Sequence, residues 1–201
     1  MKTPLTDLGS PAILVIDMQR DFVDAGAPIE CPGARAIIPD IARLLDVARE
    51  RQLPIIYTEE RHRHDGIDLE IANSEPPHCL EGTSGIELVP LLRPRPADYI
   101  VAKRRYSGFF ATDLDLLLRS LRVDTLILAG AATDVCVRAT AQDAHQLNYR
   151  VIVAREWVAG TSDDQHQAAL HNIDYVFGYV TSARVVLGLL EQTSATVHTE
   201  I

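Results

Sequence analysis

Short apolar segments typical of strands alternate with segments of helical spacing along most of this 201-residue chain. The apolar segments are rich in β-branched residues and lie at residues 12–16, 54–57, 99–102, 125–129, 150–153 and 175–179. Apolar residues recur with helical spacing at residues 34–51, 113–121, 133–147, 163–172 and 183–192. This alternation predicts an α/β fold, in which helices cover both faces of a parallel sheet.

The exception to the alternation is the stretch of residues 59–96, which is rich in Pro, Gly, His and charged residues. It shows no sustained period, so we expect a long connection over the sheet, and long connections in compact domains are usually functional. We see no internal repeat or linker. The chain is long enough to bury a full core, and we expect residues 1–201 to form a single domain.

The charge of the chain limits its partners. A formal net charge of -9 disfavours binding to nucleic acid or to an anionic membrane. The N-terminus lacks a cationic stretch followed by an apolar run, and no apolar segment approaches the roughly 18 residues that span a bilayer. We therefore expect a soluble, cytoplasmic protein. Cys31, Cys79 and Cys136 have irregular spacing, which predicts neither a disulfide framework nor a zinc pattern, but leaves one of them available as a working thiol.

Three polar residues lie where predicted strands end. Asp17 follows the first strand, Lys103 follows the third, and Cys136 comes just after the fourth at the start of a helix. Ligands of open parallel sheets bind beyond the C-terminal ends of the strands, because loops and helix N-termini converge there. We therefore expect these residues to meet at one edge of the sheet.

Each of the three residues also has an ordinary interpretation. A thiol in a first helical turn favours the thiolate form, although a cysteine among small apolar residues is often simply buried. A carboxylate such as Asp17 can cap a helix or form a salt bridge, and a lysine is usually a surface charge. Together, however, Cys136, Asp17 and Lys103 supply a nucleophile, a proton carrier and a cation. Phe22 and Tyr106 could line a pocket beside them, or pack in the core.

The motifs around these residues resemble those of the isochorismatase-like cysteine hydrolases. The resemblance spans residues 11–180 and rests on three segments in a specific order: DMQRDF at 17–22, KRRYSGFF at 103–110 followed by TDLD at 112–115, and GAATDVCV at 130–137. It implies a three-layer αβα sandwich with a six-stranded parallel sheet in the order 3-2-1-4-5-6. It also implies that the protein forms homodimers or homotetramers.

The resemblance implies roles for individual residues. Asp17, Lys103 and Cys136 would form a catalytic triad, and the backbone N–H groups of Ala132 and Cys136 would form an oxyanion hole. A nonproline cis peptide bond would join Ala131 and Ala132. We also expect Phe22, Tyr106 and Ala131 to contact the substrate.

A metal site is a further alternative. Nicotinamidases, which belong to the same superfamily, carry a metal in an Asp-x-His segment with a further histidine before Cys-x-x-Gly-Thr. This sequence has HCLEGT at 78–83 and offers Glu60, His62, Asp68 and His78 at comparable positions. Such carboxylates and imidazoles can bind a divalent ion. We nevertheless expect no cofactor, with His62 on a solvated loop as in members without metal.

The expected activity is that of a cysteine-dependent amidohydrolase, acting on a small amide or ureide through a thioester. Cys136 favours acyl chemistry, and the segments at 103–110 and 112–115 are most similar to the ureidoacrylate and biuret amidohydrolases. Three alternatives stay open: a nicotinamidase-like metal-assisted amidase, an isochorismatase-type vinyl ether hydrolase, and a catalytically inactive binding protein of the same fold.

Overall fold

The computed structural model describes residues 3–70 and 75–192. Within them, one six-stranded sheet runs in the order β3-β2-β1-β4-β5-β6, and all neighbouring strands are parallel. The strands are β1 (Pro11–Ile16), β2 (Ile55–Glu60), β3 (Tyr99–Lys103), β4 (Thr125–Ala131), β5 (Arg150–Ala159) and β6 (Tyr179–Thr181). The predicted fold class and strand order are confirmed.

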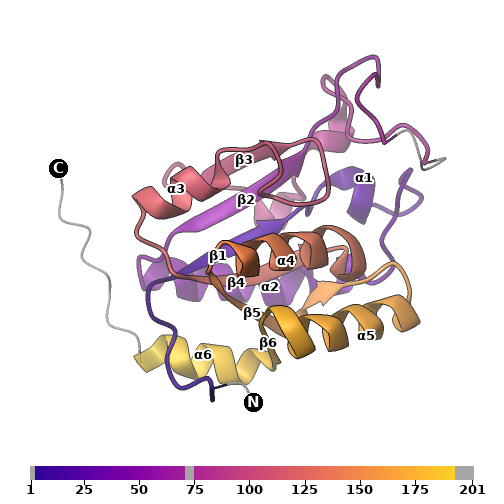
Figure 1. Cartoon of the computed structure of the whole chain (residues 1–201). Helices are drawn as coiled ribbons and strands as arrows, with labels where there is room; N and C mark the ends of the chain where they lie inside the picture. The colour runs from indigo at the N-terminus through magenta and orange to yellow at the C-terminus, as the bar shows by residue number, and fades with distance from the viewer. Residues whose placement is uncertain (1–2, 71–74, 193–201) are drawn as a thin grey trace.

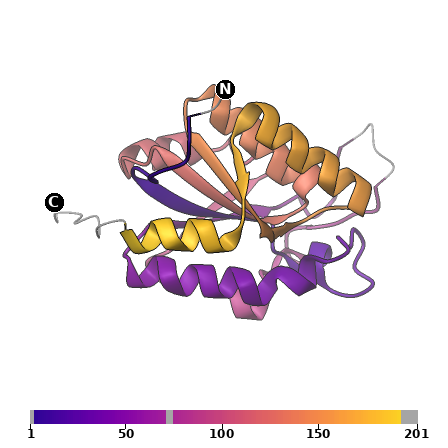
Figure 2. The ribbon, with the colours of Figure 1, turned by 90° about the horizontal axis from the view of Figure 1, so that it is seen from below.

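Helices cover both faces of this sheet, as Figures 1 and 2 show. One face carries α2 (Ala34–Glu50) and α6 (Ala183–Gln192). The other carries α3 (Leu114–Ser120), α4 (Arg138–Gln146) and α5 (Asp163–Asn172). A short helix, α1 (Arg20–Val23), follows β1 at the C-terminal edge of the sheet. No helix in the described ranges has both the length and the apolarity to cross a membrane.

Burial of the central strand on both faces explains its continuous apolar sequence. Along β1, Ile13 and Val15 pack into the core on one face, whereas Leu14 and Ile16 pack into the core on the other. A strand buried on both faces needs apolar side chains at every position. The two cores fix the register of β1 against β4 and so fix where each strand ends.

The predicted strand at 175–179 is wrong. Residues Ile173–Phe177 form a π-helical turn, η4, and β6 begins only after Gly178. A Cβ atom on residue 178 would lie 2.4 Å from the carbonyl oxygen of Val151, so the chain joins the sheet where glycine allows the approach. Tyr175 is 77% exposed. Residues 175–179 are mostly aromatic or β-branched, as in a buried strand, but most of them do not form one.

The long connection between β2 and β3 is more ordered than its composition predicts. It contains two short 3-10 turns, η1 (Ser84–Ile86) and η2 (Pro90–Leu92). Isolated bridges join His62 to Leu80 and Gln19 to Leu88. The bridge between Gln19 and Leu88 holds the connection next to α1, whereas the bridge between His62 and Leu80 folds the connection back on itself.

Candidate active site

The structure brings Asp17, Lys103 and Cys136 together at the C-terminal edge of the sheet. Asp17 follows β1 directly, Lys103 is the last residue of β3, and Cys136 lies in η3 (Thr133–Val137), a π-helical turn after β4. All three are buried, with 1%, 1% and 5% of their surface exposed. The Nζ atom of Lys103 lies 2.7 Å from Oδ2 of Asp17 and 3.7 Å from Sγ of Cys136.

Gly130 makes this convergence possible. It pairs with Ile16 across β1 and β4 and has a φ of 122°, which side chains rarely tolerate. A Cβ atom there would lie 2.1 Å from the carbonyl oxygen of Ile16. Only glycine therefore lets the segment leading to Cys136 pass directly beside the end of β1. The peptide bond between Ala131 and Ala132 is cis, as expected.

Asp17 is held in place from the neighbouring strand. Its φ is 49°, in the left-handed region, and the hydroxyl of Thr58 donates a hydrogen bond of 2.7 Å to its Oδ1 atom. Oδ2 is left facing Lys103. Because β2 holds one oxygen and β3 the other, the carboxylate has a fixed orientation, and an oxygen of Asp17 lies within 4.8 Å of the Cys136 sulfur.

The electrostatics of the group favour a protonated thiol at rest. Burial raises the pKa of Cys136 well above its usual value, and the carboxylates of Asp17 and Glu60 raise it further, against the opposing effect of Lys103. Burial also raises the pKa of Asp17, although Lys103 opposes this. Burial alone would lower the pKa of Lys103, but the neighbouring anions keep it well above its ordinary value. The thiol therefore needs a base beside it in order to react.

Glu60, the last residue of β2, is a fourth member of this buried group. Its Oε2 atom lies 2.7 Å from Nζ of Lys103. Gln19 fixes the backbone of Glu60, because its side chain donates to the carbonyl oxygen at 2.8 Å and accepts from the N–H at 2.7 Å. From the sequence, Glu60 is a candidate only for a metal ligand. Glu60 ends a strand, as Asp17 and Lys103 do, and this could have indicated its place in the site. The predicted strand stops at residue 57, so Glu60 is not recognised as a strand end.

A pocket with an empty volume of about 530 Å³, its open mouth included, gives access to Cys136. Its lining residues are Phe22, Ile29, Glu30, Cys31, Glu60, Glu75, His78, Tyr106, Ala132, Val135, Cys136 and Thr161. Phe22 and Tyr106 thus lie where the sequence analysis expected substrate contacts. Ala131 does not line the pocket: as the last residue of β4 it packs into the core.

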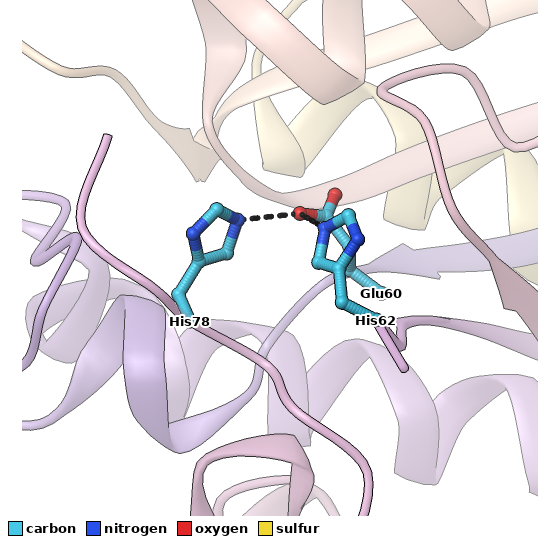
Figure 3. Close-up of side chains that lie close together, drawn as sticks. All are labelled: Glu60, His62 and His78. Atoms are coloured by element: carbon cyan, nitrogen blue, oxygen red, sulfur yellow. Dashed lines mark hydrogen bonds and ion pairs between the residues drawn. The ribbon is translucent and has the colours of Figure 1, made fainter. Parts of the chain in front are cut away.

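Glu60, His62 and His78 form a buried cluster at the same pocket (Figure 3). The Nε2 atoms of His78 and His62 lie 2.9 and 3.3 Å from Oε1 of Glu60. His62 has no exposed surface, so the expectation that it belongs to a solvated loop is wrong. The bridge to Leu80 folds the loop back over it. Burial of this kind depends on contacts between distant segments, which spacing alone does not reveal.

Both histidines direct their Nε2 atoms at Oε1 of Glu60. Nδ1 of His78 lies 2.9 Å from the carbonyl oxygen of Pro76, which can only accept, so Nδ1 carries a proton. Nδ1 of His62 faces Oδ1 of Asp68 at 3.4 Å. In neutral histidines of this tautomer, two nitrogen lone pairs and a carboxylate oxygen converge. These atoms could coordinate a cation placed between them. Alternatively, each Nε2 atom can donate a hydrogen bond to Glu60.

The donor set fits a divalent metal ion. Ligand atoms about 2.1 Å from a zinc ion, at right to tetrahedral angles, lie ~3.0–3.4 Å from one another, close to the separations found here. Glu70 adds a carboxylate, with Oε2 at 3.8 Å from Nε2 of His62. Both Glu70 oxygens are buried without a hydrogen-bond partner, although Oε1 lies 3.7 Å from the Arg105 guanidinium.

Asp68, the remaining metal candidate from the sequence, lies outside this donor set. One oxygen accepts the backbone N–H of Arg63 at 2.9 Å, and the other lies 3.0 Å from the Arg104 guanidinium. Asp68 faces the Nδ1 side of His62, away from the convergence point. Its hydrogen bonds go to Arg63 and Arg104 instead.

Comparisons with known proteins agree with this geometry. The model of the isochorismatase domain matches residues 11–185. The chain is 32% identical over 188 residues to a maleamate amidohydrolase of Pseudomonas putida, covering 86% of this chain and 83% of that protein. It is 28% identical over 207 residues to the ureidoacrylate amidohydrolase RutB of Agrobacterium fabrum, covering 91% of each. A pyrazinamidase of Pyrococcus horikoshii, solved in complex with zinc, superimposes with a TM-score of 0.80 at 30% identity, covering 86% of this chain and 99% of that chain.

Proposed function

Because this chain belongs to the isochorismatase family, we propose that it is a cysteine-dependent amidohydrolase, which cleaves an amide or ureido C–N bond in a small molecule. One observation carries the proposal: Cys136 lines an open pocket, and its thiol lies 3.7 Å from a buried ammonium that is itself paired with a carboxylate. Asp17, Lys103 and Cys136 are its proposed catalytic residues.

The first half of the reaction forms a thioester. Asp17 takes the proton of the Cys136 thiol, and the thiolate attacks the carbonyl carbon of the substrate. The backbone N–H groups of Ala132 and Cys136 are the proposed donors to the developing oxyanion. As the tetrahedral intermediate collapses, the C–N bond breaks, and Asp17 returns its proton to the leaving nitrogen. Ammonia or an amine departs, and the acyl group stays on sulfur.

The second half restores the enzyme. Asp17, again a carboxylate, takes a proton from a water molecule, whose oxygen attacks the thioester carbonyl. The C–S bond breaks, the thiolate recovers a proton, and a carboxylic or carbamic acid leaves. Lys103 stays charged throughout, because Asp17 and Glu60 both lie 2.7 Å from its Nζ atom. Its charge stabilises the thiolate in each half.

The substrate class rests on the relatives. The two curated relatives described above are named for amide hydrolysis, of maleamate and of ureidoacrylate. The segment at 103–110, with Tyr106 on the pocket wall, favours the ureido side of this range. We therefore place small ureides and carbamoyl amides first among the candidate substrates.

The test is ammonia release from nicotinamide, biuret, ureidoacrylate, N-carbamoylsarcosine and maleamate. We expect at least one of these compounds to be hydrolysed by the wild type and not by Cys136→Ala. Cys79→Ala is the matched control, because Cys79 is buried outside the pocket. Hydrolysis by Cys136→Ala at the wild-type rate would refute the proposal. A wild type that hydrolyses none of the five, with a thiol as unreactive as free cysteine, would favour a binding protein.

A second feature of the same pocket supports a metal-assisted form of this chemistry. We propose that Glu60, His62 and His78, with Glu70 beside them, bind a divalent cation. Imidazole with carboxylate is a donor set typical of zinc, and a solved relative is described in complex with zinc. When bound, such an ion supplies a Lewis acid at the pocket wall. The residues themselves hold the ion site beside Lys103, because Glu60 contacts both His78 and Lys103.

A further inference from the structure

Asp134, two residues before Cys136, makes two hydrogen bonds to Thr161, a residue that lines the pocket. Its Oδ1 atom accepts the backbone N–H of Thr161 at 2.9 Å, and its Oδ2 atom accepts the hydroxyl of the same residue at 2.5 Å. Thr161 lies in the junction between β5 and α5, and it lines the pocket. One carboxylate therefore ties the turn that carries the thiol to a wall residue.

Gly160 shows how closely this junction packs. A Cβ atom at residue 160 would lie 2.9 Å from Oδ1 of Asp134 and 2.6 Å from Cβ of His166, so a side chain there would push the wall away from η3. A second hydrogen bond joins η3 to α5, the helix that follows the junction, because Nδ1 of His166 lies 2.9 Å from the hydroxyl of Thr133. The junction is thus fitted against the turn rather than loosely laid over it.

The same junction also contacts Cys31, another residue that lines the pocket. The thiol of Cys31, in the loop before α2, lies 3.2 Å from the carbonyl oxygen of Gly160. Burial raises the pKa of Cys31 to about 12, so the thiol stays protonated and can donate to this carbonyl. Cys31 and Thr161 both line the pocket. A shift of the junction would therefore move both Cys31 and Thr161 relative to Cys136.

We propose that Asp134 is a positioning residue, which holds Thr161 and the Cys31 wall at a fixed distance from Cys136 and so shapes the part of the pocket that binds the non-reacting end of the substrate. This inference rests on the proposed amidohydrolase function. Asp134 lies outside the group of Asp17, Lys103 and Cys136. Its loss should therefore weaken substrate binding and leave the chemistry of the thiol intact.

The experiment compares Asp134→Ala and Asp134→Asn with the wild type, on whichever amide of the five-compound panel the wild type hydrolyses. Asparagine can accept the Thr161 N–H and donate to its hydroxyl, so it should preserve the contact and rescue activity. We expect Asp134→Ala to raise KM about tenfold, since a hydrogen bond to a charged group is lost, with kcat changed less than about twofold. Asp164→Ala, on exposed α5 surface, is the matched control and should behave as wild type.

A second readout separates positioning from damage to the nucleophile. Iodoacetamide alkylates a thiolate without using the outer pocket, so its rate at Cys136 should be the same in Asp134→Ala and wild type. An unchanged KM in Asp134→Ala would overturn the inference. So would a parallel fall of kcat and alkylation rate, because Asp134 would then be holding the turn of Cys136 itself.

Thr161→Ala covers the case in which Asp134→Ala does not fold. It removes only the hydroxyl partner, and it should raise KM in the same direction by a smaller factor. An unchanged KM in a folded Thr161→Ala would then overturn the inference. Failure of the proposed function would appear separately, in a wild type that releases no ammonia in a Cys136-dependent way.

Discussion

The Nζ atom of Lys103 lies 3.7 Å from the Sγ atom of Cys136, although 33 positions separate the two residues in the chain. The same ammonium lies 2.7 Å from both Asp17 and Glu60, so one buried cation faces two carboxylates and a thiol. The thiol that must lose a proton, the Asp17 carboxylate that can accept it and the Lys103 ammonium therefore lie together in one buried group. It also makes Lys103 the residue on which the local charge balance depends.

Removal of that cation should destabilise the fold. Lys103→Met leaves Asp17 and Glu60 buried without their shared partner, and breaking a buried ion pair in this way costs about 3–5 kcal/mol. Urea denaturation measures the loss. The double variant Lys103→Met with Glu60→Gln removes one of the stranded charges and should be more stable than Lys103→Met alone. If the double variant is the less stable of the two, the charge balance described here is wrong.

Gly130→Ala should be among the most damaging single substitutions in the protein. Its methyl group would lie 2.1 Å from the Ile16 carbonyl oxygen, at a φ of 122° that alanine rarely adopts. We expect a loss of at least ~3 kcal/mol in the free energy of unfolding. Gly188→Ala, in α6 with no atom within 4 Å of the new Cβ, is the contrasting control. It should stabilise the protein by about 0.5–1 kcal/mol, and equal effects at the two positions would contradict the steric argument.

Zinc should bind the metal-stripped protein and raise its melting temperature. At a free concentration about 100 times Kd, binding contributes ~2.7 kcal/mol, which for a chain of this size is a shift of roughly 5–10 °C. His78→Ala removes a proposed ligand and should lose most of the shift. His64→Ala, on the exposed part of the same connection, should keep it. A wild type whose melting temperature does not respond to zinc would rule out the metal site and leave the cysteine chemistry standing.

His166 should make stability depend on pH. Burial lowers the pKa of His166 below 6.5, against the effects of Asp134 and Asp163 and together with that of Arg155. The unfolded chain therefore takes up this proton at a higher pH than the folded protein, and stability falls as the pH drops through about 6.5. His166→Asn should reduce this loss. The urea midpoints of the two proteins are measured at pH 7.5 and 5.5. An equal fall of the midpoint in wild type and His166→Asn would contradict the role of His166.

The strand ends explain how much of the site could be predicted from sequence. Asp17 and Lys103 were found because each follows an unbroken apolar run, and Cys136 because a small-residue turn precedes it. Glu60 was not placed beside Lys103, because the apolar run of the second predicted strand ends at residue 57, three positions before it. In the structure, the Thr58 hydroxyl is satisfied by Asp17, a partner 41 positions away.

Long-range packing accounts for the other errors. His62 lies in a charged, proline-rich stretch, and its burial arises from the bridge to Leu80 rather than from its neighbours in sequence. Residues 175–179 have strand-like composition, but the approach to β5 is set by the single residue Gly178. Local pattern could identify the elements, whereas these contacts between distant segments decide which polar residues are buried.

The mass of the enzyme during turnover tests directly whether Cys136 forms a thioester. Rapid acid quenching of the wild type with a hydrolysed amide, followed by peptide mass spectrometry, should reveal one acyl group on the peptide that contains Cys136. The mass gain should equal the substrate minus its amine, and Cys136→Ser should show no such thioester while releasing no ammonia. An acyl-free Cys136 peptide throughout turnover, with ammonia release intact in Cys136→Ser, would contradict the account.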